Sequence, residues 1–572
     1  MTRDFADQSI QSFPFGKFRH LLTLSVLSGL LFTTTLPVRG VPLIAFVALV
    51  PLLFAEEIIH RDRSRFRRGS FFLLAFITFL IWNTAGSWWL KNASVFGAVA
   101  AVLVNTLLMA TVMQLFHGSR KVFTRNHIAY AVLICYWLGF EYFHHNWDLT
   151  YPWFSLGNVF SSWPAWVQWY EYTGMPGGSL WILVGNLLVL SLVKDWLPDE
   201  QKRRNIFRKS LTVLLWIAVP SIFSIILFHT YSSEGEEFDV VLVQPNNDPY
   251  NTQYTIGPLT AVGNFLNLAE PLVDQNTQFV VGPESMIQEN IWERHLDRSP
   301  SIDSLKSYVS MNPHVTVING ASSFRMIYKD EPITVSAREI DPDFLTGFAS
   351  YYGVPRDKLS GWYDAYNLGF ALDTSGITGM THKSKLVAGV ERMPFKKYLS
   401  SIAGDLALDM GGTVGTLAMD EERAVFIHQP SGYKYGVAIC YESVFGEFFG
   451  RFVKNGADMM FIITNDGWWG NTPGHRQHNA FASLRAIETR RDIARSANTG
   501  ITCFINQRGE VLQPVEYWVP GAIKGTIKAN DTITFYVRYG DYLGKLALFL
   551  AVVFLVMQVS YAILPLHRRR SA

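Results

Sequence analysis

The sequence predicts a multi-pass α-helical membrane domain joined to an α/β domain that lies outside the membrane. Apolar segments of membrane-spanning length recur along the chain, and basic residues gather in alternate loops between them. Short β-branched runs alternate with helical patterns across the polar stretch 230–540. A hydrophobic content of 49% with only 17% charged residues separates this chain from ordinary soluble proteins.

About eight segments are expected to cross the membrane, because each approaches the roughly 17 to 25 apolar residues that a spanning helix needs. The shortest, 41–55, contains Pro42 and Pro51, yet the alternation of charge requires a span there. The eight segments lie near 20–37, 41–55, 70–90, 94–116, 127–144, 176–194, 209–229 and 541–564.

The distribution of positive charge predicts the orientation of the spans. Cytoplasmic loops carry an excess of lysine and arginine, so three basic loops and the C-terminal tail are assigned to the cytoplasm. These residues are Arg61, Arg63, Arg65, Arg67 and Arg68; Arg120, Lys121 and Arg125; Lys194, Lys202, Arg203, Arg204, Arg208 and Lys209; and Arg568, Arg569 and Arg570.

Three parts of the chain follow from this orientation. Residues 1–229 form the transmembrane domain of seven spans, 230–540 form an exoplasmic domain, and 541–572 form the final helix with its basic cytoplasmic tail. The formal net charge of +2 gives no reason to expect nucleic acid as a partner.

The exoplasmic segment contains short, largely apolar runs that are typical of strands in an α/β domain. Two further stretches, 368–386 and 501–512, are expected to form hairpins that turn at Thr374-Ser375-Gly376 and Arg508-Gly509. The single strands are expected at 239–244, 278–285, 315–320, 436–440 and 459–466.

Only Cys135, Cys440 and Cys503 are present, which excludes a disulfide-dense scaffold and a zinc site built from several thiolates. Cys440 ends an apolar strand and precedes residues with helical spacing, so its thiol is expected at a strand-to-helix junction. The positive end of a helix favours thiolate over thiol, as a nucleophile requires. A small buried hydrophobe is the alternative for Cys440, and the same packing role is expected for Cys135 and Cys503.

Four motifs, in order, resemble those of the nitrilase, or carbon-nitrogen hydrolase, superfamily: VGPES (281–285), THKSKLVAGVE (381–391), GVAICYES (436–443) and TNDGWWG (464–470). With seven preceding spans and one following, the chain looks specifically like the apolipoprotein N-acyltransferase family. The resemblance implies that the outer domain is a nitrilase-like αββα sandwich.

By position, the resemblance assigns Glu284 as general base, Lys383 as the oxyanion-side lysine and Cys440 as nucleophile. Taken singly, Glu284 and Lys383 would be solvated surface charges. Chemically, a thiol needs a carboxylate to take its proton, which Glu284 can do if burial raises its pKa, and a developing oxyanion needs a fixed positive group.

Further site residues are implied around this triad. Glu391, Tyr441 and Glu442 match supporting residues of the family, although the segment LVAGVE before Glu391 departs from the usual family sequence. A structural salt bridge is the alternative for Glu391. Trp468 and Trp469 are expected to contact lipid or acyl chain, with core packing as the alternative for at least one of them.

The resemblance implies acyl transfer from phospholipid, through a Cys440 thioester, to the α-amine of a diacylglyceryl-cysteine at the N-terminus of an apolipoprotein. It implies no cofactor and no metal, a bacterial inner-membrane location, and a catalytic domain that faces the periplasm. Two alternatives are a membrane-tethered amidase or nitrilase that uses the same triad, and a catalytically silent scaffold that binds lipoprotein.

Other polar residues receive simpler interpretations. His475 and His478 give no complete metal-ligand set, so a structural role is preferred. Residues 393–417 are expected to form a mobile glycine-punctuated arm at the bilayer surface, and the insertion 327–362 receives no role. Three asparagines within spans are expected to make interhelical hydrogen bonds, namely Asn83, Asn105 and Asn186.

Overall fold

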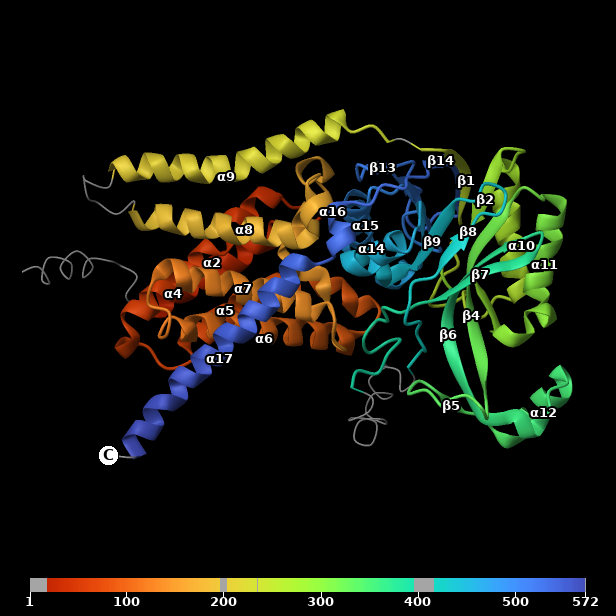
Figure 1. Ribbon diagram of the computed structural model, residues 1–572, viewed down its shortest axis with the longest axis horizontal. Helices are drawn as coiled ribbons and strands as arrows, with labels where there is room; N and C mark the ends of the chain where they lie inside the picture. The colour runs from red at the N-terminus through yellow and green to blue at the C-terminus, as the bar shows by residue number, and fades with distance from the viewer. Residues whose placement is uncertain (1–17, 196–202, 234, 396–415, 571–572) are drawn as a thin grey trace, which may run out of the picture.

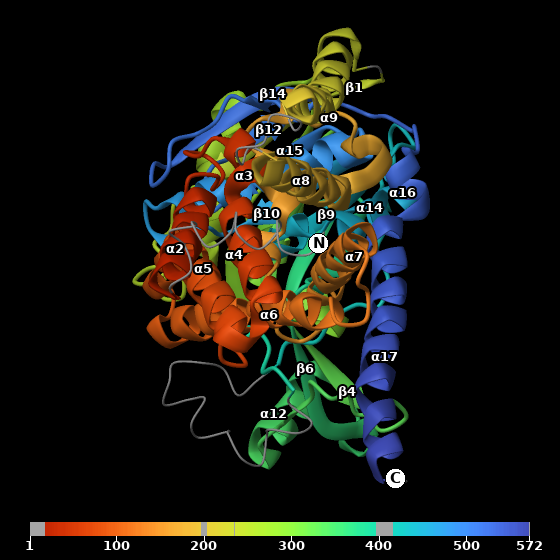
Figure 2. The ribbon, with the colours of Figure 1, turned by 90° about the vertical axis from the view of Figure 1, so that its left-hand side faces the viewer.

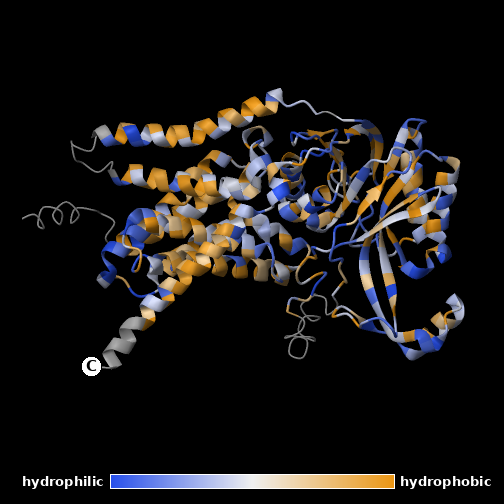
Figure 3. Ribbon diagram, viewed as in Figure 1, coloured by the Kyte–Doolittle hydropathy of each residue, from blue (hydrophilic) through white to orange (hydrophobic). Residues whose placement is uncertain are grey.

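The computed structural model describes residues 18–195, 203–233, 235–395 and 416–570, which form a helical bundle and an α/β domain side by side (Figure 1). Apolar residues cover most of the bundle, whereas in the α/β domain they concentrate in the strands and inner helix faces (Figure 3). The bundle helices are α2 (Phe18–Thr33), α3 (Ala45–Ala48), α4 (Val50–Arg61), α5 (Ser70–Ser87), α6 (Val95–Ser119), α7 (Asn126–His144), α8 (Tyr170–Asp195), α9 (Arg203–Thr230) and α17 (Tyr542–Arg570).

All eight expected segments are helical, but their lengths differ. Six stretches among the described residues are long and apolar enough to cross a membrane: Pro42–Arg61, Ser70–Asn92, Val95–Ser119, Tyr170–Lys194, Asn205–Thr230 and Tyr542–Ile563. The helix Phe18–Thr33 is shorter than this length, and α7 is not among the six.

The proline-containing segment 41–55 forms a helix because its prolines lie at helix starts. Pro42 opens a 3₁₀ turn (Pro42–Ile44), and Pro51 lies in the first turn of α4. A proline there removes no hydrogen bond, since the first amide groups of a helix have no intrahelical acceptor.

Buried asparagines join the bundle helices, as the sequence predicts. Asn105 of α6 donates to Asn83 Oδ1 of α5 at 2.6 Å. Asn186 of α8 donates to the Ala45 carbonyl at 2.7 Å and accepts from the Leu49 amide at 2.9 Å. Figure 2 shows α17 along one side of this bundle, beside α7 and opposite α2.

Two sheets pack face to face in the α/β domain. The eight-stranded sheet follows the order β14-β1-β2-β4-β6-β5, with β3 on β4 and β7 on β6, and the six-stranded sheet runs β13-β12-β11-β10-β9-β8. The strands are β1 (Glu237–Gln244), β2 (Thr277–Val281), β3 (Ile287–Trp292), β4 (Thr316–Tyr328), β5 (Arg338–Glu339), β6 (Leu359–Asp373), β7 (Gly376–His382), β8 (Val425–Ile427), β9 (Lys434–Ile439), β10 (Met459–Thr464), β11 (Ile493–Ala497), β12 (Cys503–Ile505), β13 (Val511–Leu512) and β14 (Gly521–Lys528).

Helices cover both outer faces, so the domain is the expected αββα sandwich. Apolar side chains of both sheets, such as Phe279 and Phe461, meet in the middle. The helices α10 (Pro258–Ala269) and α11 (Pro300–Met311) pack on the eight-stranded sheet. The helices α14 (Gly446–Lys454) and α15 (Pro473–Thr489) pack on the six-stranded sheet and against the bundle.

The predicted strands and both predicted hairpins are present, and two strands are longer than expected: β4, and β6, which begins at Leu359. The strand expected at 315–320 continues to Tyr328 and pairs along its length with β6. The insertion 327–362 connects the far ends of the antiparallel strands β4 and β6. It contains β5 and α12 (Pro342–Tyr352) and lies away from the bundle (Figure 1). Most of the arm expected at 393–417 lies outside the described residues.

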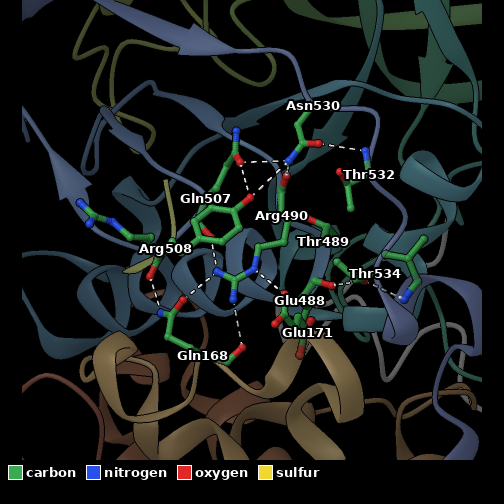
Figure 4. Close-up of polar contacts among 12 residues, drawn as sticks. Gln168, Glu171, Glu488, Thr489, Arg490, Gln507, Arg508, Asn530, Thr532 and Thr534 are labelled. Atoms are coloured by element: carbon green, nitrogen blue, oxygen red, sulfur yellow. Dashed lines mark hydrogen bonds and ion pairs between the residues drawn. The ribbon is translucent and has the colours of Figure 1, made fainter. Parts of the chain in front are cut away.

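Buried hydrogen bonds hold the two parts together around Arg490, the residue after α15 (Figure 4). Its guanidinium bonds Glu171 at 2.7 Å and Gln168 Oε1 at 2.7 Å, both from the bundle side. The Gln507 carbonyl of the sandwich accepts a third bond at 3.0 Å. Because a buried charge is costly without such partners, this cluster fixes how the sandwich sits on the bundle.

Candidate active site

The three expected catalytic residues follow the ends of three strands. Glu284 comes after β2, Lys383 directly after β7 and Cys440 directly after β9. Because β2 and β7 belong to one sheet and β9 to the other, the residues approach one another across the sandwich. Functional groups in α/β domains collect at such strand ends.

Lys383 lies between two carboxylates. Its ammonium donates to Glu284 Oε1 at 2.8 Å and to Glu391 Oε1 at 2.7 Å, and Asn367 also donates to Glu284 Oε1 at 2.8 Å. Only 2% of Lys383 is exposed. Burial alone would lower the pKa of Lys383, but Glu284 and Glu391 outweigh it and raise that pKa well above its usual value. Lys383 is therefore a fixed cation.

Cys440 is buried beside this pair and has a left-handed backbone, with φ of 52°. Burial raises the pKa of the Cys440 thiol, the charge of Glu284 raises it further, and Lys383 opposes them. The α-helix expected directly after Cys440 begins only at Gly446, because residues Cys440–Val444 form a 3₁₀ turn. Burial is therefore the largest influence on the pKa of the thiol.

Glu442 connects the end of β9, just before Cys440, to the segment that follows Lys383. Its carboxylate accepts from the Ile439 amide at 2.8 Å and from the Ser384 amide at 2.6 Å. Burial raises the pKa of Glu442 to about 7, against the effect of these two amides. Ile439, just before Cys440, and Ser384, just after Lys383, therefore donate to the same side chain.

Glu391 and Tyr441 complete the supporting set. Glu391 Oε2 accepts from the Val387 amide at 2.8 Å, so this carboxylate both contacts Lys383 and shapes the loop after it. Tyr441 is buried and donates to the Thr150 carbonyl of the bundle side at 3.1 Å. The unusual sequence before Glu391 does not remove it from the site.

The two tryptophans have different surroundings. Trp469 packs against Trp89 and Trp153 of the bundle, with ring centroids 5.0 and 5.9 Å apart. Trp468 contacts Tyr250 and Tyr254, with centroids 5.4 and 6.1 Å apart. Trp469 therefore packs in the core, as was expected for at least one of the two tryptophans. Contact of either ring with lipid stays a prediction.

A buried charged network behind Cys440 was missed by sequence reasoning. Asp466 accepts from Arg495 at 2.7 Å and contacts His478 Nδ1 at 2.8 Å. The other ring nitrogen of His478 lies 3.2 Å from the Cys440 carbonyl oxygen. The motif around Asp466 and the histidines of α15 were visible in the sequence, but no spacing rule connects them to Arg495 in β11.

The same network contains the one group of possible metal ligands found among the described residues, namely Cys440, Asp466 and His478. Asp466 is already bonded to His478 and Arg495, and His478 Nε2 lies 3.2 Å from both the Cys440 carbonyl and Ser443 Oγ. These donors are arranged as a hydrogen-bonded support for the nucleophile turn.

Comparison with known proteins covers both parts of the chain. A family model described as apolipoprotein N-acyltransferase N-terminal domain matches residues 28–188, and one described as carbon-nitrogen hydrolase matches residues 336–535. An apolipoprotein N-acyltransferase of Chlorobaculum tepidum is 28% identical over 541 residues, which span 93% of this chain and 95% of that protein. Over nearly all of its length, the chain is therefore similar to apolipoprotein N-acyltransferases.

A second relative and a solved structure are also similar to this chain. An apolipoprotein N-acyltransferase of Geobacter metallireducens is 25% identical over 540 residues, 91% of each chain. The crystal structure of Saccharomyces cerevisiae Nit3, of the nitrilase superfamily, is 14% identical with a TM-score of 0.36, covering 52% of this chain and 92% of Nit3. The similarity to the N-acyltransferase relatives thus extends over both the bundle and the sandwich.

We expect Asp466→Asn to lower the free energy of unfolding by about 3–5 kcal/mol, because Arg495 would remain buried without its counter-charge. Denaturant titration of the detergent-solubilised protein measures this change. The double variant Asp466→Asn/Arg495→Met should recover part of the loss. Glu510→Gln, which removes a partly exposed pair with Arg508, serves as control and should cost no more than about 1 kcal/mol. Equal stability of Asp466→Asn and Glu510→Gln would show that the network does not stabilise the fold.

Proposed function

We propose that the protein transfers an acyl chain from phospholipid to the α-amine of the diacylglyceryl-cysteine at the N-terminus of an apolipoprotein. The joint match of the bundle to the N-acyltransferase N-terminal domain and of the sandwich to carbon-nitrogen hydrolases carries the proposal. A membrane-tethered amidase is not favoured, because the full-length relatives are N-acyltransferases. No cofactor or metal is invoked.

The first half-reaction forms a thioester. Glu284 takes the Cys440 proton, and the sulfur attacks the ester carbonyl of the phospholipid. The buried ammonium of Lys383, with a backbone amide near Cys440, stabilises the oxyanion. As the bond from the acyl carbon to the glycerol oxygen breaks, Glu284 returns the proton and a lysophospholipid leaves.

The second half-reaction transfers the acyl chain. The α-amine attacks the thioester, the C–N bond forms and the C–S bond breaks. The proton that the amine loses passes through Glu284 to the Cys440 sulfur. Glu391 and Asn367 position the charged pair throughout, because they bond Lys383 and Glu284 in the resting site. Trp468 and Trp469 flank the route of the acyl chain.

The orientation in the membrane is part of the proposal. Eight spans, with Phe18–Thr33 and α7 added to the six long apolar stretches, bring both termini to the cytoplasm. In the bacterial inner membrane, the seven-span domain is then formed by residues 1–229, and the final helix by residues 541–572. The catalytic domain, residues 230–540, lies in the periplasm. Phospholipid and apolipoprotein both reach the site from that side.

We expect Cys440→Ala to fold, to form no acyl-enzyme and to give no N-acylated lipoprotein, and Cys440→Ser to be severely impaired. Mass spectrometry of the Cys440 peptide after incubation with phospholipid measures the thioester. Cys135→Ala and Cys503→Ala are matched controls that should keep both activities, since neither thiol belongs to the site. Normal product from Cys440→Ala would rule out the thioester mechanism.

We expect Glu284→Gln and Lys383→Met to respond differently to pH. In Glu284→Gln the base is missing, so thioester formation should rise from pH 6 to 9 as more of the Cys440 thiol ionises unaided. Lys383→Met loses the oxyanion partner, which typically costs about 10²–10³ in rate, and should show little rescue. Single-turnover acylation by a fluorescent phospholipid measures both. Equal rescue would contradict the assigned roles.

We expect a reporter fused after Ala572 to be cytoplasmic and one inserted near Glu236 to be periplasmic, because the basic loops lie on the side of the termini. Alkaline phosphatase and a fluorescent protein, which are active on opposite sides, report the two locations. A cytoplasmic signal at residue 236 would contradict both the eight-span topology and the location of the active site.

A further inference from the structure

Four cations gather around the start of α14, near the active site but outside it. The Arg423 guanidinium stacks on the Phe448 ring at 4.2 Å, and the Lys385 ammonium lies 4.6 Å from the Phe445 centroid and 6.0 Å from that of Phe448. Arg451 and Lys545 approach from the same side through Glu447, at 3.6 and 2.7 Å. The group is rich in positive charge.

The nearby carboxylates are engaged elsewhere. Glu442 accepts from two backbone amides, and Asp420 accepts from the amide of His382 and contacts its Nδ1. Glu447 is shared by Arg451 and Lys545. Within the described ranges, Lys385 and Arg423 therefore have no carboxylate at ion-pair distance.

Two fully buried cations of this chain have more polar partners than the half-buried Lys385 and the buried Arg423. Lys383 has two carboxylates, and Arg491 donates to the four carbonyls of Ala457, Thr489, Arg490 and Thr532. Lys385 donates to one carbonyl, that of His145 at 2.8 Å, and Arg423, which is 8% exposed, donates to that of Asp420 at 2.5 Å. Burial, and after it the repulsion from neighbouring arginines, lowers the pKa of Lys385 to about 8.

The location suits a lipid headgroup. Lys385 contacts the residue after α7, Lys545 lies in the first turn of α17, and Gly544 packs against Tyr142 near the end of α7. The cations therefore lie where these two helices leave the bundle for the sandwich. Lipid phosphates lie at this depth when the helices span the bilayer, and basic side chains bind them there.

The same cations are connected to the nucleophile. Lys385 is two residues after Lys383 in the sequence. The Phe445 ring, beside Lys385, packs edge-on against Tyr441 with centroids 5.1 Å apart, and Tyr441 follows Cys440. A lipid whose phosphate lies between Lys385 and Arg423 thus has its glycerol esters directed along two aromatic rings toward the thiol.

We propose that Lys385 and Arg423 form a binding site for the phosphate of the phospholipid acyl donor. The phosphate supplies an anion that no carboxylate of the described residues provides at ion-pair distance, and it distinguishes the donor from the acceptor, whose diacylglyceryl group carries no phosphate. The site therefore acts in thioester formation and not in the transfer step. This inference rests on the proposed function.

Lys385→Met and Arg423→Met test the site, because methionine keeps an apolar stem beside the phenylalanine rings. Single-turnover thioester formation is measured against the concentration of a short-chain phosphatidylglycerol. Each variant should raise the half-saturating concentration by about tenfold, equal to about 1.4 kcal/mol, with the limiting rate unchanged within about twofold. Arg423→Lys should recover part of the affinity, and Lys454→Met, an exposed cation on α14, should have no effect.

Two further measurements test whether Lys385 and Arg423 act only through the phosphate of the donor or in catalysis generally. A phosphate-free p-nitrophenyl ester of the same acyl chain should acylate Cys440 at the same rate in every variant. The preformed thioester should pass to an acceptor peptide equally fast. The phosphate site would be contradicted if a variant lost as much acylation rate with the phosphate-free ester as with phosphatidylglycerol. It would also be contradicted if the half-saturating concentration of phosphatidylglycerol did not change. If the wild-type enzyme reacts with the p-nitrophenyl ester but not with phospholipid, the proposed function itself is wrong.

Discussion

The burial of Lys383 is the constraint on which the rest of the active site depends. A lysine that is 2% exposed keeps its charge only because Glu284 and Glu391 both contact it. Those carboxylates come from different segments, so the charge is compensated only when β2 and the loop after β7 have reached their native places. The charge that would stabilise an oxyanion also specifies the fold around it. Removing Lys383 would leave two carboxylates facing each other without a counter-charge.

The sandwich and the bundle share one layer of structure, the helix α15. The helix α15 is buried on all sides between the six-stranded sheet and the bundle. Gln477 near its start accepts from Trp153 at 2.7 Å, and Arg490 after its end bonds Glu171. His478, on the same helix, supports the turn of Cys440. A single helix thus contacts both the turn that begins at Cys440 and the helical bundle, so its packing fixes their separation.

Motifs and local patterns predicted much of this structure. The strand ends at Glu284, Lys383 and Cys440 follow from apolar runs interrupted by polar residues, and the sandwich follows from the resemblance that those motifs carry. The strand β11 was not anticipated, because its sequence IARSA contains Arg495, which is fully buried and paired with Asp466. Pairing across 29 residues leaves no local signal. For the same reason His478 gave no sign of its contact with Cys440, and the depth of Cys440, which raises its pKa, could not be judged from the helical spacing after it.

The cations of this chain divide into two classes by the partners that surround them. Arg495, Arg490 and Lys383 are buried with carboxylates, and their free energy is already lowered by the fold, so they fix positions. Among the described residues, Lys385 and Arg423 are held by one carbonyl each and by phenylalanine rings, and they repel one another, so an anion between them would lower their free energy further. A phosphate there gains both the attraction of two charges and the relief of their repulsion. Under the proposed phosphate site, selective binding of the donor then follows from positive charge that no carboxylate among the described residues pairs with.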